Sequence, residues 1–318
     1  MSEANGPFDV LTMGRVGVDL YPERTGVPLH EVETFARFLG GSATNVAVAA
    51  ARYGRRSAVI TRTGADPFGR YVHEALRGFG VDDRFVTPVA HLPTPVVFCE
   101  IFPPDDFPLY FYRYPKAPDL EIYAGELDLD AIRAARFFSV TGTGLSEEPS
   151  RTATVEALRA RERRDHTVLD LDYRPMFWPS AGEASEVIGE TVRHATVAVG
   201  NLDEVEVAVG SRKPHEAADR LLEAGVRLAV VKQGPKGVLA CTADERVEVP
   251  PVPVDVVNGL GAGDAFGGAL AHGLLAGWDL GEVMRFCNAA GALVSSRLAC
   301  ADAMPTADEV EDLLKANS

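Results

Sequence analysis

The stretch Asn258-Gly-Leu-Gly-Ala-Gly-Asp-Ala-Phe-Gly-Gly268 joins a glycine-rich turn to an apolar run. Three apolar side chains recur every four residues, a spacing that buries one face of a helix: Phe266, Leu270 and Leu274. The turn at such a helix start carries backbone N–H groups without partners in the helix, at the positive end of the helix dipole. Glycines let an anion approach these N–H groups closely. We therefore predict that the charge of a phosphoryl group is held by Gly261, Ala262 and Gly263.

Asp264 follows this turn directly. Because a carboxylate repels a bound phosphate, we predict that Asp264 is a catalytic base that takes the proton of an attacking hydroxyl during phosphoryl transfer. With an ordinary pKa of about 3.9 it would be ionised at neutral pH. Taken alone, Gly-Ala-Gly-Asp is more typical of a tight turn capped by Asp. A dinucleotide fingerprint is excluded because Phe266 stands where glycine is required, and a P-loop is excluded because Gly-Lys occurs nowhere.

Composition narrows the class of protein. The chain has 318 residues, 46% of them hydrophobic, and a net charge of −15, which disfavours nucleic-acid or anionic-membrane partners. The same charge repels phosphate-bearing and acidic ligands, so a site for such ligands needs local positive groups. The four cysteines form no Cys-x-x-Cys pair and indicate buried free thiols in a reducing compartment. No signal peptide or sufficiently long apolar run is found, so we expect a cytoplasmic enzyme.

Apolar strand patterns alternate with helical patterns along the chain, which predicts an α/β fold with a mostly parallel sheet. Strands are expected at 9–13, 57–60, 136–140, 167–171, 196–199, 227–232 and 238–240, and helices at 46–53, 70–79, 149–161 and 305–315. Residues 96–101 and 109–114 read as a hairpin. With residues 31–39 it would form a second, smaller sheet, or else it is a peripheral hairpin of the same domain.

A second motif, Gly40-Gly41-Ser-Ala-Thr-Asn45, enters the first helix. Paired glycines let a ligand touch the backbone, and the amide of Asn45 can both donate to and accept from hydroxyls. An ordinary helix entry with an N-cap explains the residues equally well. Asp19 is expected just beyond the first strand, where open α/β sheets hold ligands.

These motifs resemble the two signatures of the ribokinase/PfkB sugar-kinase family, Gly-Gly-x-x-x-Asn and Asp/Asn-Thr-x-Gly-Ala-Gly-Asp. Gly259 stands where threonine is usual, which leaves open any contact of the threonine hydroxyl. The resemblance runs from Gly14 to Ala292. It implies a ribokinase-like three-layer sandwich with a mostly parallel central sheet. It also implies a single domain over 1–318, with a β lid formed by about 20–38 and 92–116 that provides a homodimer contact.

The resemblance also implies roles for individual residues. Sugar hydroxyls would be bound by Asp19, Gly40, Gly41 and Asn45. The substrate's acid group would be held by Tyr112-Arg113, in an aromatic-aromatic-Arg run similar to that of 2-keto-3-deoxygluconate kinases, and by Arg174, which could instead contact the phosphoryl group or form a surface ion pair. Glu204 would contact Mg²⁺ through water. The nucleotide would be bound by Asn201, Lys232, Gly234, Gly237, Gly261, Gly263 and Asn288, although Asn201 alone is more typical of a helix cap.

Five stretches are most similar to kinases of 5-dehydro-2-deoxygluconate in myo-inositol catabolism: 13–22, 67–70, 107–113, 170–178 and 258–268. The similarity implies an ATP- and Mg²⁺-dependent sugar-acid kinase that acts on the C6 hydroxyl. It leaves open a requirement for a monovalent cation such as K⁺. Alternatives are a kinase for 2-keto-3-deoxygluconate, fructose or a nucleoside, and a non-catalytic sugar-binding regulator. Retention of Asp264 and the glycines disfavours the regulator.

Overall fold

The computed structural model describes residues 6–317, and its core is a nine-stranded sheet in the order β13-β12-β11-β10-β9-β8-β1-β4-β5. Neighbouring strands pair in parallel, except at β11–β12 and β12–β13. Most of these strands are short apolar runs because helices cover both faces of the sheet. Their bounds are β1 Val10–Met13, β4 Ser57–Gly64, β5 Val86–Val89, β8 Phe137–Thr141, β9 Thr167–Asp170, β10 Val197–Asn201, β11 Leu228–Lys232, β12 Val238–Cys241 and β13 Arg246–Val249.

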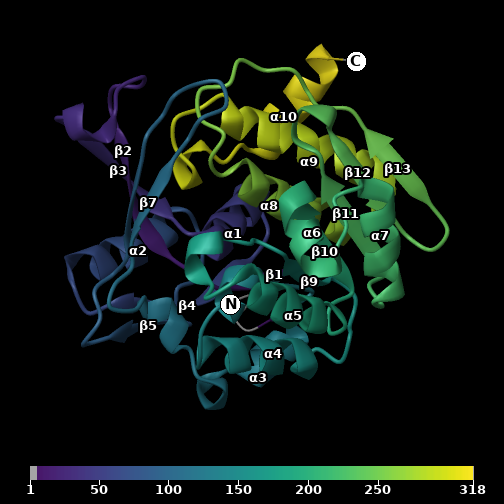
Figure 1. Ribbon diagram of the computed structural model, residues 1–318, viewed down its shortest axis with the longest axis horizontal. Coiled ribbons are helices and arrows are strands. Elements are labelled where there is room, and N and C mark those ends of the chain that lie inside the picture. The colour runs from purple at the N-terminus through teal and green to yellow at the C-terminus, as the bar shows by residue number, and fades with distance from the viewer. Residues whose placement is uncertain (1–5, 318) are drawn as a thin grey trace.

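Two helical layers complete the three-layer α/β sandwich that the sequence predicts (Figure 1). One face of the sheet packs against α1 Ser42–Arg52, α2 Pro67–Gly78, α8 Ala262–Ala276, α9 Leu280–Ser295 and α10 Ala307–Ala316. The other face packs against α3 Leu129–Ala134, α4 Ser150–Ala160, α5 Ala181–Val192, α6 Leu202–Val209 and α7 Pro214–Glu223. The predicted three-layer sandwich with a mostly parallel central sheet is confirmed.

A second sheet of four strands stands beside this body, with β2 and β3 in purple at the left of Figure 1. Its order is β3-β2-β6-β7, with bounds β2 Gly17–Pro22, β3 Phe35–Gly40, β6 Val96–Cys99 and β7 Leu109–Tyr112. β6 and β7 form the expected antiparallel hairpin. Asp19 lies beyond the first strand, as expected, and it belongs to β2, because the chain enters this second sheet at Gly17.

Two helices begin earlier than the sequence predicts. Helix α2 begins at Pro67 rather than at residue 70, because the Asp66 side chain caps it by accepting the N–H of Gly69. Helix α1 begins at Ser42 rather than at residue 46, because Gly41 adopts a φ of 103° as its N-cap. This places Asn45 in the first turn of α1. Asn288 lies within α9, whose start is capped by the Asp279 side chain, which accepts the N–H of Glu282.

Two further expectations concern cysteines and membranes. All four cysteines are free and buried: Cys99, Cys241, Cys287 and Cys300. Within residues 6–317, no helix combines the length and the apolar character needed to traverse a bilayer.

Candidate active site

The N-terminus of α8 forms the centre of the candidate site. Gly261 is its N-cap with a φ of 82°, in the left-handed region that favours glycine. Helices α8 and α1 pack closely, since a Cβ on Gly268 would lie 2.3 Å from the Cβ of Ala49. This contact brings the first turns of both helices together, and Asn45 Nδ2 donates to Asp264 Oδ2 at 2.8 Å. The two motifs therefore meet at one point.

A small cavity of about 60 Å³ lies over this helix terminus. Six of the predicted residues line it: Asp19, Gly41, Asn45, Arg174, Gly261 and Asp264. Val97, Leu109 and Phe111 of the second sheet close the other side. A water molecule needs at least about 10–15 Å³ of such volume, so this space holds a few waters rather than a hexose.

Burial shifts the pKa of Asp264 to about 7. The hydrogen bond from Asn45 and the charge of Arg15 oppose this shift, while Asp172 and Asp170 add to it. The ordinary pKa expected from the sequence is therefore wrong, because the carboxyl is withdrawn from water. A base whose pKa lies near the working pH is better suited to general-base catalysis than an ordinary carboxylate.

The side-chain amide of Asn45 has one polar atom that is already hydrogen-bonded and one that is not. Its Nδ2 is bonded to Asp264, whereas its buried Oδ1 has no hydrogen-bond partner in the described part of the chain. Buried polar atoms in proteins are nearly always satisfied, so a free acceptor facing a cavity suits a ligand hydroxyl.

Asp19 is held by a chain of side chains at the wall of the cavity. Tyr21 donates its hydroxyl to Asp19 Oδ2 at 2.9 Å, and the same hydroxyl lies 2.8 Å from the sulfur of Cys300. Burial raises the pKa of Asp19 to about 6, against the opposing effects of Tyr21 and Arg15. Gly40 must be glycine because a Cβ there would lie 2.1 Å from Asp19 Oδ1.

Arg15 and Asp172 belong to the site although the sequence analysis did not assign them. Arg15 lines the cavity, and its Nε lies 3.5 Å from Asp172 Oδ2. The other oxygen of Asp172 lies 3.2 Å from Arg174 Nη2, and Ser42 and Thr143 also donate to Asp172. Burial raises the pKa of Asp172, but the two arginines outweigh it, so the pKa is lowered overall. In the sequence, the feature that could have identified Arg15 is its position: it is a positively charged residue just after the first strand.

The predicted nucleotide residues fall on the neighbouring strand ends. Asn201 and Glu204 form a capping box at the start of α6: Asn201 Oδ1 accepts two helix N–H groups, and Glu204 Oε2 accepts the N–H of Asn201. Both line a cavity of about 720 Å³ that also contacts Arg174. Arg174 thus lies between this cavity and the one over Asp264.

Lys232 lies at the end of β11, and its Nζ would be 3.3 Å from a Cβ on Gly263. Burial lowers the pKa of Lys232, but Asp170, Glu204 and Asp264 more than offset this, so the pKa is raised and the ammonium stays charged. A fixed cation therefore stands beside the predicted phosphoryl cradle.

The donors present suit Mg²⁺ bound mainly through water and phosphate. Residues 6–317 contain no group of three or more metal-binding side chains. Mg²⁺ commonly takes one or two carboxylates together with substrate phosphates, which the single carboxylate of Glu204 can satisfy.

Gly237 and Asn288 both contact the backbone at the end of β13. A Cβ on Gly237 would lie 2.0 Å from Val249 O, and Asn288 Nδ2 donates to Val249 O and Pro250 O at 3.2 and 2.9 Å. Gly234, with a φ of 58°, begins the turn between β11 and β12. None of the three lines either cavity described above; together they shape the edge of the sheet beyond Lys232.

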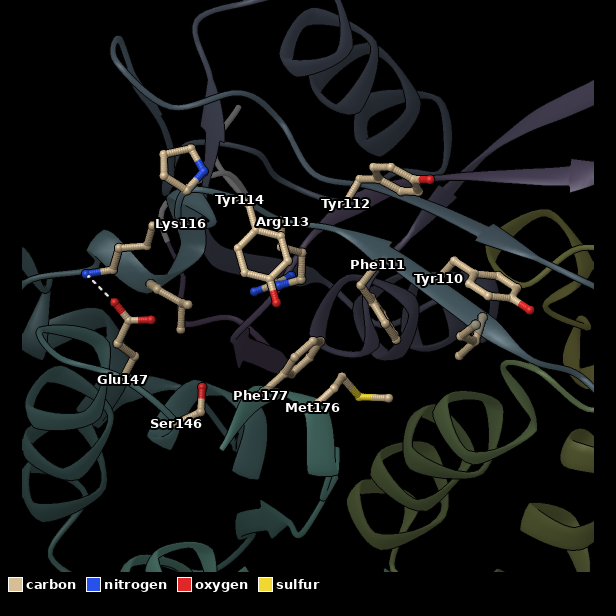
Figure 2. A pocket seen from close by; sticks show the side chains of 13 residues that line it. Tyr110, Phe111, Tyr112, Arg113, Tyr114, Lys116, Ser146, Glu147, Met176 and Phe177 are labelled. Atoms are coloured by element: carbon tan, nitrogen blue, oxygen red, sulfur yellow. Dashed lines mark ion pairs between the residues drawn. The ribbon is translucent and has the colours of Figure 1, made fainter. Parts of the chain in front are cut away.

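Tyr112 and Arg113 lie outside the cavity over Asp264. They line a separate space of about 430 Å³ between β7 and residues 176–177, drawn in Figure 2. Arg113 is 9% exposed, donates to both oxygens of Asp119 and lies over the ring of Phe177. Tyr112 is 63% exposed and packs its ring edge against Phe98.

Position 259, where glycine replaces threonine, lies against an aromatic ring. A Cβ there would lie 3.1 Å from Phe107, which comes from the loop between β6 and β7. A side chain at position 259 would therefore require a small shift of this ring.

Comparisons with known proteins agree with this geometry. A family model described as pfkB family carbohydrate kinase matches residues 8–307. Over 317 residues the chain is 31% identical to a 5-dehydro-2-deoxygluconokinase from Clostridium tetani, covering 97% of this chain and 93% of that protein. A fructokinase from Xylella fastidiosa with bound ATP gives a TM-score of 0.85 at 23% identity, covering 97% and 99% of the two chains. A fructokinase double mutant from Vibrio cholerae O395, with bound fructose, ADP and potassium ion, gives 0.84 at 25% identity, covering 98% and 99%.

Proposed function

The chain belongs to the pfkB family of carbohydrate kinases, and from this premise we propose that it transfers the γ-phosphoryl group of ATP to the C6 hydroxyl of 5-dehydro-2-deoxygluconate. The single observation that carries the proposal is the hydrogen bond between Asn45 and Asp264 at the start of α8. The substrate is supported by the 5-dehydro-2-deoxygluconokinase from Clostridium tetani, and by two arginines that line the same cavity.

In the proposed reaction, Asp264 accepts the proton of the C6 hydroxyl as that oxygen attacks phosphorus. The N–H groups of Gly261, Ala262 and Gly263 hold the phosphoryl charge at the helix N-terminus. Lys232, charged and beside Gly263, adds a fixed positive charge that needs no rearrangement during the transfer. Arg174, between the two cavities, is suited to contact the phosphoryl group as it crosses.

Asp19, Gly40, Gly41 and the free Oδ1 of Asn45 are proposed to bind the remaining hydroxyls of the substrate. Because the space over Asp264 is smaller than a hexose, we propose that the second sheet acts as a lid that moves outward when substrate enters. Closure excludes water and so protects ATP from hydrolysis in the absence of sugar.

Asn201, Lys232, Gly234, Gly237 and Asn288 are proposed to bind ATP, with Glu204 facing Mg²⁺ through water. When bound, Mg²⁺ would neutralise phosphate charge and orient the γ-phosphoryl group. A K⁺ site is proposed by analogy with the potassium-bound fructokinase from Vibrio cholerae. A homodimer through the lid is supported by the exposed rings of Tyr110 and Tyr112 on its outer face, and the use of ATP suits a cytoplasmic location.

The test is release of ADP, measured in a coupled assay with ATP·Mg²⁺ and a panel of 5-dehydro-2-deoxygluconate, 2-keto-3-deoxygluconate and fructose. We expect the first to be preferred, and Asp264→Asn to lower kcat by about 10²–10⁴-fold while ATP and sugar still bind. Asp279→Asn, which keeps the cap of α9, is the matched control and should leave kcat unchanged. Near-normal turnover in Asp264→Asn would remove Asp264 from the mechanism.

A further inference from the structure

We propose, on the basis of the function above, that Arg15 binds the carboxylate of the substrate, and that Arg113 is a positioning residue that holds the backbone of Arg15 through Asp119. Three arginines lie near the candidate site: Arg15, Arg113 and Arg174. They differ in how much of their hydrogen-bonding capacity the protein already uses and in which cavities they line, and these two differences together assign their roles.

Arg113 has little capacity left for a ligand. Its two terminal nitrogens donate to the two oxygens of Asp119, at 2.7 and 3.4 Å, and both side chains are almost fully buried. In Figure 2 it lies among the residues of the separate cavity, behind the ring of Tyr114. To reach a substrate over Asp264, Arg113 would have to leave a buried carboxylate unpaired, which is strongly unfavourable.

Arg15 has the opposite character. Its side chain is only 12% exposed, and its buried Nε has no hydrogen-bond partner in residues 6–317. Its acidic neighbour Asp172 lies 3.5 Å from this Nε, beyond ordinary hydrogen-bond length. A buried N–H group without a partner is costly unless a ligand completes it, and the two terminal nitrogens remain available to accompany it. Because it lines the cavity with Asp19 and Asp264, that ligand is the substrate.

Arg174 is less suited to the carboxylate. Its Nε is also buried without a partner, but its side chain is 35% exposed and lines both the cavity over Asp264 and the larger cavity that contains Asn201 and Glu204. Arg15 lines only the first of these two. The acid group of the substrate must lie away from the hydroxyl that meets the phosphoryl group, so the arginine farther from the phosphate side is the better partner.

The peptide unit between Arg15 and Val16 is fixed at both of its polar atoms. Thr44 Oγ1 donates to Arg15 O at 3.3 Å, and Val16 N donates to Asp119 Oδ2 at 3.1 Å. Gly41 leaves room for this carbonyl, because a Cβ there would lie 2.4 Å from Arg15 O. Arg113 in turn holds Asp119 by its two hydrogen bonds. The Arg113–Asp119 pair therefore orients the backbone from which Arg15 extends.

The experiment compares 5-dehydro-2-deoxygluconate with its C1 amide, which keeps the shape of the acid and removes its charge. For Arg15→Gln we expect the ratio of kcat/KM for acid over amide to fall by about 10²-fold, mainly through KM, as for loss of a charge-assisted hydrogen-bonded pair. Arg15→Lys, which keeps the charge but not the planar fork, should lose part of this preference. Arg246→Gln on β13, exposed and paired with Asp219, is the control and should keep the wild-type ratio.

Two double variants separate positioning from direct binding. Arg113→Met with Asp119→Asn removes the guanidinium but keeps an oxygen for the N–H of Val16, and we expect an acid preference within about threefold of wild type. Arg113→Met with Asp119→Leu removes that oxygen too, and we expect the preference to fall about tenfold. Replacing a buried ion pair by groups of similar size is tolerated in many proteins, and thermal denaturation of each variant checks this.

The outcomes distinguish this inference from the proposed function. A wild-type enzyme that shows no preference for the acid over the amide would overturn both. A wild-type enzyme that prefers the acid, together with an Arg15→Gln variant that keeps the preference, would overturn only the assignment of Arg15. A loss of about 10²-fold in Arg113→Met with Asp119→Asn would identify Arg113 as the direct ligand and overturn its positioning role.

Discussion

The hydrogen bond from Asn45 to Asp264 should set the pH dependence of the reaction. Burial holds the pKa of Asp264 near 7, and Asn45 Nδ2 lowers it by stabilising the ionised form. The base must be ionised, so kcat/KM for the sugar should fall tenfold per pH unit below about pH 7. Removing the amide in Asn45→Leu withdraws stabilisation from the carboxylate alone, so the pKa of Asp264 rises and the limb moves to higher pH.

The size of this shift follows from the energy of the bond. A hydrogen bond to a charged group contributes about 1.5–3 kcal/mol, and one pKa unit corresponds to about 1.4 kcal/mol. The limb should therefore move up by about 1–2 pH units. At pH 7 the ionised fraction of Asp264 would drop from about one half to between about 1% and 10%. If kcat/KM of Asn45→Leu stays below that of the wild type even on the high-pH plateau, the remaining difference would report the contact of Asn45 Oδ1 with the substrate.

The assay is the pH profile of kcat/KM for the sugar at saturating ATP·Mg²⁺ in a coupled ADP-release assay. Asp264→Asn is the second arm, because its small residual activity should lack the limb near pH 7 altogether. The reasoning is refuted if the limb stays in place in Asn45→Leu. It is equally refuted if the residual activity of Asp264→Asn keeps the same limb, since another group would then be titrating.

Two further predictions concern residues that hold the site and the core. In Gly261→Ala the new Cβ would lie 2.9 Å from the Cys300 sulfur, on a residue whose φ is 82°. Because the N–H groups that hold the phosphoryl charge would have to move, we expect kcat to fall by about 10-fold or more and KM to change less, as measured by steady-state kinetics. Arg161 is 1% exposed and donates hydrogen bonds to four backbone carbonyls, those of Ile132, Arg133, Ala135 and Asp165. Arg161→Met leaves these buried carbonyls without their donor, so the free energy of unfolding measured in urea should fall by about 3 kcal/mol. A fall of less than about 1 kcal/mol would contradict this role.

Local sequence signals were sufficient for the centre of the site. Both motifs are glycine turns that open helices, and their resemblance to the two family signatures predicts that Asn45 and Asp264 share a site, which they do. Strand order would not have placed them together, because α1 follows β3 of the second sheet and α8 follows the irregular residues 250–261. The boundary of α1 was misjudged because the unusual backbone of Gly41 moved the helix start toward the N-terminus.

Contacts between distant segments could not be read in the same way. Alternation along β7 does predict that Phe111 faces the cavity and that Tyr110 and Tyr112 face away. By the same alternation Arg113 would lie on the same face as Phe111. However, Arg113 follows the last residue of β7, and its side chain is paired with Asp119 instead. The pKa of Asp264 depends on how completely segments far apart in the sequence exclude water from it, which no local pattern encodes.

The net charge of the chain gives these cations their importance. At −15 the protein as a whole repels both ATP and a sugar acid, so binding depends on positive groups placed at the site itself. Arg15, Arg174 and Lys232 gather around the start of α8, each next to buried carboxylates that keep it in position. Salt screens the repulsion at long range more than it screens these buried contacts. The affinity for the acid should therefore fall little, or even rise, as ionic strength increases, which is opposite to the behaviour of an enzyme that attracts anions through its overall field.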